Sequence, residues 1–69
     1  MAKFKVHIDR EITDAGRTAL QAVSERVVPH DATTTVHGVE APTAGHAQRL
    51  VGQTIGLSEE EIARSVRAY

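Results

Sequence analysis

The sequence predicts a small α/β (α+β) domain with the element order β-α-β-α-α, in which residues 1–69 form a single unit. Three observations predict this fold class: alternating apolar and polar residues near the N-terminus, apolar residues at helical spacing in later segments, and a run of threonines between them. We expect a two-stranded sheet with helices on one face and a C-terminal helical hairpin. We also expect oligomerisation to extend the sheet.

The first strand is expected from Lys3 to Asp9, where every second residue is apolar, as in a strand with one buried face. Its apolar positions are Phe4, Val6 and Ile8. A helix is expected over residues 14–27, because apolar residues then recur every three or four positions and Thr13 is a suitable N-cap. Pro29 is expected to end this helix, since proline lacks an N–H and disfavours helical geometry in the residue before it.

The second strand is expected over residues 32–39, because its β-branched threonines favour extended backbone. One face of this strand would carry Thr34 and Val36. The opposite face would carry Thr33, Thr35, His37 and Val39. Two strands that are joined through a helix are most simply parallel, with a right-handed crossover.

A second helix is expected to begin after Thr43, which is a suitable cap, and to continue to Ile55. Gly45 and Gly52 lie inside it, and each weakens a helix by about 1 kcal/mol relative to alanine. We therefore expect another backbone to pack close to these two glycines.

The last helix has the clearest local signal in the sequence. Gly56 favours a left-handed stop for the preceding helix, and Ser58 with Glu61 three residues later forms a capping box. The apolar residues that follow are spaced as one helical face, and we expect this helix to reach Tyr69. The two helices would then form a hairpin with a very tight turn.

Composition excludes several classes of protein. Eight Lys and Arg residues against nine Asp and Glu give a net charge of -1, which lacks the strongly basic footprint of most nucleic-acid-binding proteins. The absence of cysteine excludes a disulfide scaffold, a cysteine zinc site and thiol catalysis. No apolar run has the length of a membrane span, and no signal-peptide pattern is present, so we expect a cytoplasmic protein without a membrane partner.

The small size of the chain predicts association. A chain this short buries only about 60 % of the surface that its unfolded form exposes, and a two-stranded sheet leaves unpaired edges. We therefore expect a homo-oligomer or a protein partner, held through sheet edges and the helical hairpin. The residues assigned to this partner surface are Thr33, Thr35, Ile62, Val66 and Tyr69.

The sequence contains no phosphate-binding loop, dinucleotide-binding or nucleophile-elbow pattern, and we assign no catalytic or cofactor-binding residue. The leading hypothesis is a non-enzymatic accessory module that acts through protein–protein interaction. An alternative is a zinc or nickel site formed by His7 and His37, which fall on the same polar face of the predicted sheet together with Asp9. Two solvated histidines on an open face are the competing interpretation.

A second alternative is a helix-turn-helix transcriptional regulator, because the turn Gly56–Ser58 resembles the turn of that motif. The helix that would read DNA begins with three consecutive glutamates, where contacts to phosphates and bases are normally made. The sequence therefore gives no reason to expect a nucleic-acid partner.

Overall fold

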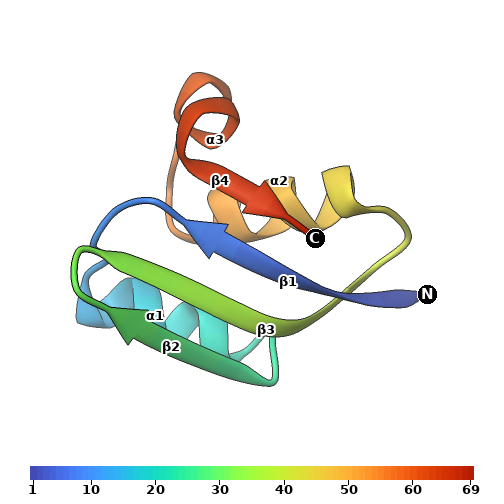
Figure 1. The fold of residues 1–69 in the computed structure, drawn as a ribbon, viewed down its shortest axis with the longest axis horizontal. Coiled ribbons are helices and arrows are strands. Elements are labelled where there is room, and N and C mark those ends of the chain that lie inside the picture. Colours follow the sequence, from blue (N-terminus) through green and yellow to red (C-terminus); the bar gives the residue numbers. More distant parts are fainter.

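The computed structural model describes residues 1–69, which form three helices and four strands. They are β1 (Ala2–Ile8), α1 (Asp14–Gln21), β2 (Arg26–His30), β3 (Thr33–Ala41), α2 (Ala44–Thr54), α3 (Glu59–Ser65) and β4 (Val66–Ala68) (Figure 1). The strands form one sheet in the order β2-β3-β1-β4, and every neighbouring pair is antiparallel. The predicted α+β class is confirmed, but the predicted two-stranded sheet is wrong, because the sheet has four strands.

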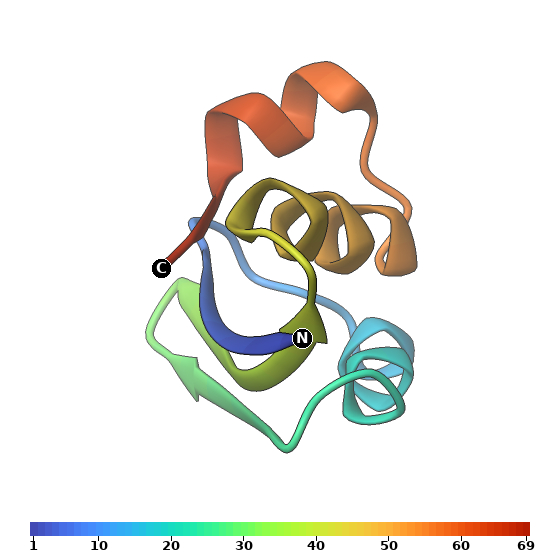
Figure 2. The same cartoon turned by 90° about the vertical axis from the view of Figure 1, so that its right-hand side faces the viewer.

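Helices α1 and α2 lie on one side of the sheet, and no helix lies on the other side (Figure 2). The third helix, α3, stands beyond the edge formed by β4 and leads directly into that strand (Figure 1). Apart from α3, the element order is β-α-β-β-α-β, which is the split β-α-β arrangement of ferredoxin-like domains. The sheet therefore keeps one face free of helices.

Strand β2 was not predicted, because its residues continue a helical spacing. Val23 and Val27 are four residues apart, as on one face of a helix, but α1 ends at Gln21. In the structure Val27 pairs with Val36 of β3 and extends the sheet. Pro29 lies inside β2, where an edge strand tolerates a residue without an N–H.

The extra strand also overturns the predicted parallel pairing. β2 and β3 form a hairpin, so the chain reverses before it reaches the strand that neighbours β1, and β1 and β3 are antiparallel. The hairpin turn places Asp31 at a φ of 55°, a left-handed conformation that aspartate tolerates better than most residues. The strand expected over residues 32–39 is observed as Thr33–Ala41.

A bulge in β3 changes which residues face the core. Phe4 pairs with Val39 and Val6 pairs with Val36, so β3 has one residue more than β1 between the two pairs. Gly38 has a φ of 72°, the left-handed conformation that a bulge of this kind requires and glycine adopts most easily. As a result, Val36 and Val39 are both fully buried, and the prediction that Val39 shares the polar face is wrong.

The predicted turn and capping box before α3 are confirmed. The Glu61 backbone N–H donates to the Ser58 hydroxyl, and the Ser58 N–H donates to the Glu61 carboxylate. The helix ends at Ser65 rather than Tyr69, because Val66 pairs with Ile8 and the chain continues as β4.

The two glycines of α2 differ in their surroundings. A Cβ on Gly52 would lie 2.3 Å from Cγ1 of Ile62, so the element that packs against this glycine is the side chain of α3 and not another backbone. No atom would lie within 4 Å of a Cβ on Gly45. The expectation of a close backbone approach is therefore wrong at both positions.

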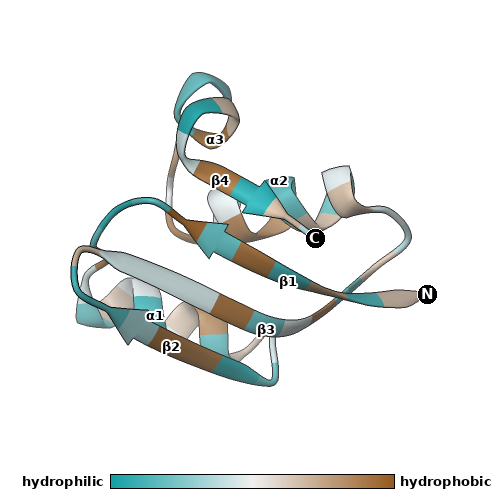
Figure 3. Cartoon of the chain, in the orientation of Figure 1, coloured by the Kyte–Doolittle hydropathy of each residue, from teal (hydrophilic) through white to brown (hydrophobic).

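The core is one cluster between the sheet and the helices, and hydrophobic bands along the strands mark its residues (Figure 3). Its buried members are Val6, Ile8, Leu20, Val36, Val39, Ala41, Ala47, Val51, Ile62 and Val66. The accessible surface of the chain is 4204 Å². A folded monomer of this mass is expected to expose about 4,200 Å². The accessible surface of the chain therefore equals that expected of a folded monomer of its mass. None of the helices has the length and apolar character that a membrane span requires.

Candidate functional site: the open face of the sheet

The face of the sheet that no helix covers has a distinct chemistry (Figure 2). Its side chains alternate along each strand with the buried ones, and the strand register aligns them across the sheet. We call this surface the open face, and its residues are Lys5, His7, Arg26, Val28, His30, Thr33, Thr35, His37, Arg67 and Tyr69. These ten residues include three permanent cations and three histidines, and the next register pair, Lys3 and Glu40, places one carboxylate at the end of the face.

The cations of the open face have no ion-pair partner. Three of the eight Lys and Arg residues of the chain do form ion pairs with carboxylates, namely Lys3, Arg10 and Arg17. Lys5, Arg26 and Arg67 form none, so three of the five remaining cations lie together on one face. Their charges are therefore available to a ligand.

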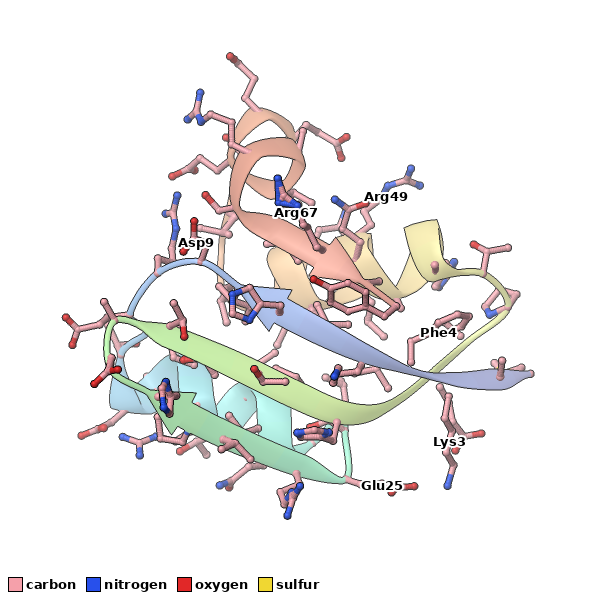
Figure 4. All side chains as sticks on the ribbon, viewed as in Figure 1. Lys3, Phe4, Asp9, Glu25, Arg49 and Arg67 are labelled. Atoms are coloured by element: carbon pink, nitrogen blue, oxygen red, sulfur yellow. The ribbon has the colours of Figure 1, made fainter.

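Carboxylates stand only at the ends of the open face. Lys3 binds Glu25 at one end of the sheet, and this hydrogen bond raises the pKa of Lys3. Figure 4 shows Lys3 and Glu25 at one end of β1 and Asp9 at the other end. It also shows Arg67 on the neighbouring strand β4. The acidic residues thus limit the basic surface to the middle of the sheet.

The structure places the two histidines of the predicted metal site on neighbouring strands. His7 lies opposite Thr35, with 3.4 Å between His7 Nδ1 and Thr35 Oγ1. His37 is two residues further along β3 and pairs with Arg26 on its other side. Such diagonal neighbours have Cβ atoms about 7–8 Å apart or somewhat less, which long side chains can bridge. No group of three or more His, Cys, Asp or Glu side chains gathers anywhere in the chain, so these two histidines would need ligands from outside.

The residues predicted to form a partner surface fall into two groups. Thr33, Thr35 and Tyr69 belong to the open face, and 64 % of Tyr69 is exposed. Ile62 and Val66 belong to the core, with 6 % and 0 % exposed. A partner cannot reach these two side chains while α3 is packed on α2.

Both edges of the sheet are protected against pairing with another chain. At the β4 edge, both backbone groups of Val66 are bonded within the chain. The Val66 N–H donates to Ile62 C=O, and the Val66 C=O accepts from Gln48 Nε2 at 2.6 Å. The strand has only three residues, which leaves little backbone for a partner. At the other edge, Pro29 removes a donor from β2. The open face is therefore a better binding surface than either edge.

The helical hairpin does not have the chemistry of a DNA reader. The first turn of α3 contains three glutamates, and the third is tied into the fold. A hydrogen bond from the Ser58 backbone N–H, together with one from Arg10, lowers the pKa of Glu61 and keeps it ionised. Negative charge here stabilises the helix start and would repel phosphates.

Sequence reasoning found only part of the open face. The alternation from Lys3 to Asp9 placed Lys5 and His7 on one face, and this was the available signal. The sequence predicts helix at Arg26 and at Arg67, which lie on β2 and β4 in the structure, so their alignment with Lys5 could not be foreseen.

Comparison with models of known protein families, with curated proteins and with solved structures found no match.

Proposed function

We propose that this chain is a non-enzymatic binding module that docks onto an acidic segment of a larger protein through the open face of its sheet. The observation that supports the proposal most strongly is the separation of charge. The whole chain has a net charge of -1, while the open face carries Lys5, Arg26 and Arg67, none of which forms an ion pair.

The open face suits an acidic partner because its cations align across the strands. Arg26 pairs with His37 on β3, and Arg67 pairs with His7 on β1. Neighbouring strands are about 4.8 Å apart, so the four strands present a basic strip roughly 14 Å wide. Carboxylates of an extended segment laid across this strip would meet charges that have no other partner.

A protein segment fits this surface better than a nucleic acid does. Proteins that bind single strands on a sheet stack the bases on aromatic side chains. The two central strands present Lys5, His7, Thr33, Thr35 and His37, none of which is Phe, Tyr or Trp. Tyr69 is at the margin of the sheet, where Lys5 Nζ lies 5.7 Å from its ring centroid. The overall negative charge also gives no long-range attraction for phosphate backbones.

A second copy of the chain fits the open face less well. Two open faces brought together would place like charges opposite one another, which is destabilising. The protected edges and the monomer-like accessible surface of 4204 Å² also give no driving force for a dimer. Docking to a different protein is therefore the form of association that we propose.

The test uses a ten-residue glutamate-rich peptide as the probe and two matched double variants. The first variant, Arg26→Gln with Arg67→Gln, removes two charges from the open face. The second, Arg49→Gln with Arg64→Gln, removes the same charge from α2 and α3, where neither arginine forms an ion pair. Exposed ion pairs contribute about 0.2–1 kcal/mol each, so the first variant should weaken binding about fivefold and the second should change it less than twofold.

Two results would overturn the proposal. The first is equal weakening by both double variants, which would show that net charge alone governs binding. The second is tighter binding of a single-stranded RNA of the same charge than of the peptide. Circular dichroism of each variant controls for loss of fold.

Zinc or nickel binding by His7 and His37 is the second candidate function, and the position of both side chains on neighbouring strands of the open face favours it. Calorimetric titration with each metal tests it. Heat that disappears in His7→Ala with His37→Ala, and persists in His46→Ala, is the expected result. No heat with the unaltered chain removes this candidate.

A further inference from the structure

Three of the four histidines of the chain lie on the open face. His7, His30 and His37 come from β1, β2 and β3, and His46 lies on α2. Imidazole is the side chain whose charge ordinarily changes between about pH 5 and pH 8. The open face therefore holds most of the imidazole groups of the chain.

Building on the proposed function, we propose that protonation of His7 and His37 strengthens the binding of the acidic segment. The open face would bind its partner weakly in neutral surroundings and more tightly in mildly acidic ones. Lys5, Arg26 and Arg67 supply the permanent charge, and the two histidines add to it when they are protonated.

The charged groups around His7 explain why its protonation and the binding of an acidic segment favour one another. Along the chain the nearest charged residues are Lys5 on β1 and Asp9, which follows the end of that strand, while β4 contributes Arg67 opposite His7 and β3 contributes the hydroxyl of Thr35. Protonation of His7 in the free protein thus adds a cation beside Lys5 and Arg67, with one carboxylate, that of Asp9, beyond the end of the strand. A bound carboxylate offsets this repulsion, so binding favours protonation and protonation favours binding to the same extent.

The surroundings of His37 are similar. Arg26 lies opposite it on β2, and Lys5 lies on β1 next to the bulge. Two acidic residues stand at this end of the sheet: Glu25, whose backbone N–H donates to His37 C=O and whose carboxylate binds Lys3, and Glu40, which pairs with Lys3 in the strand register. Both carboxylates act on Lys3, and an incoming carboxylate is the partner that a protonated His37 would gain.

His30 has a carboxylate beside it, unlike His7 and His37. Its Nδ1 lies 3.5 Å from Oδ2 of Asp31 in the hairpin turn, and 82 % of its side chain is exposed. An incoming carboxylate would therefore not be the first acidic group that this ring meets. We therefore expect little change in partner binding from this histidine.

The experiment measures the affinity of the glutamate-rich peptide at about pH 7.5 and about pH 5.5, at constant ionic strength and with a chelator present. The probe stays ionised across this range, because a free glutamate titrates near pH 4.3. We expect at least fivefold tighter binding at the lower pH. We also expect net proton uptake on binding, measured by calorimetry in two buffers of different ionisation enthalpy.

His7→Gln with His37→Gln should remove both effects, and His46→Gln, a substitution on α2 outside the open face, should preserve them. Binding with equal affinity at both pH values would overturn this inference and leave the proposed function intact. A pH dependence that persists in His7→Gln with His37→Gln would also overturn it. If the peptide binds at neither pH value, the proposed function and this inference are both overturned.

Discussion

The packing of α3 against α2 depends on a single buried glycine, and replacing it tests the fold directly. In Gly52→Ala the new Cβ would lie 2.3 Å from Cγ1 and 2.6 Å from Cδ1 of Ile62. It would also lie 3.3 Å from Cβ of Ile62, so rotation of that side chain cannot relieve all of the overlap. Helix α3 must therefore move away from α2, or the Ile62 side chain must leave its place in the core.

The size of the effect follows from two opposing terms. Overpacking of a well-packed core costs about 1–3 kcal/mol, whereas alanine favours a helix over glycine by about 1 kcal/mol. Because two of the new contacts are as short as 2.3 and 2.6 Å, the upper part of the overpacking range applies, and we expect Gly52→Ala to lower the free energy of unfolding by about 1–2 kcal/mol, a fall in Tm of roughly 4–16 °C for a domain of this size.

Urea unfolding followed by circular dichroism measures the change. Gly45→Ala is the matched control, because it makes the same substitution in the same helix with no atom within 4 Å of the new Cβ. This control should be neutral or stabilising by up to about 1 kcal/mol. In the background of Ile62→Ala, which removes Cγ1 and Cδ1 and keeps only the 3.3 Å contact to Cβ, Gly52→Ala should destabilise the protein less. Equal stability of Gly52→Ala and the unaltered chain would refute the packing of α3 described above.

Three further predictions concern the bulge, the helix cap and the assembly state. Gly38→Ala should destabilise the fold by about 1–2 kcal/mol in urea unfolding, because left-handed backbone disfavours a side chain, and its Cβ would lie 2.5 Å from Cγ of Glu25. Glu61 should stabilise the fold above the ordinary titration range of a glutamate and lose this contribution as the pH falls through its lowered pKa, since Ser58 and Arg10 bind its ionised form. Stability measured from neutral to acidic pH should therefore fall less steeply in Glu61→Gln. Light scattering should give the mass of one chain, 7.5 kDa, at every concentration tested.

Each of these three predictions has a result that would contradict it. A Gly38→Ala variant as stable as the unaltered chain would show that β3 does not need its bulge. A Glu61→Gln variant with unchanged pH dependence would show that the capping box does not depend on the ionised carboxylate. A dimer mass that persists on dilution would restore self-association as the role of this domain.

The sequence carried enough information for elements whose pattern is local. The alternation that predicts β1 lies within seven residues, and Thr13, Thr43 and Ser58 each cap the helix that they were expected to cap. In each case the physical cause, a pleated strand or a free N–H at a helix start, acts between residues close in the chain.

The missed elements depend on contacts between distant residues. Val27 has helical spacing but pairs with Val36, and Val66 continues the face of α3 but pairs with Ile8. Pairing with a sheet overrides a weak helical preference in both cases. The burial of Val39 likewise depends on the bulge at Gly38, which a period of two cannot anticipate.

The candidate site was missed for the same reason. Lys5, Arg26 and Arg67 are spread over almost the whole chain, and only the strand order β2-β3-β1-β4 brings them to one face. Two of the three lie on strands that the sequence did not reveal. The charge of the chain as a whole hides the cluster, because the acidic residues balance it elsewhere.

The most direct test of the central claim is an amide NMR titration of the labelled chain with the glutamate-rich peptide. If the open face is the binding surface, the largest shifts will fall on the middle of the four strands, at Lys5, His7, Arg26, Thr35 and Arg67, and the amides of α1 will remain unchanged. Shifts that concentrate on α1, α2 or α3, or an unchanged spectrum at saturating peptide, would contradict the account.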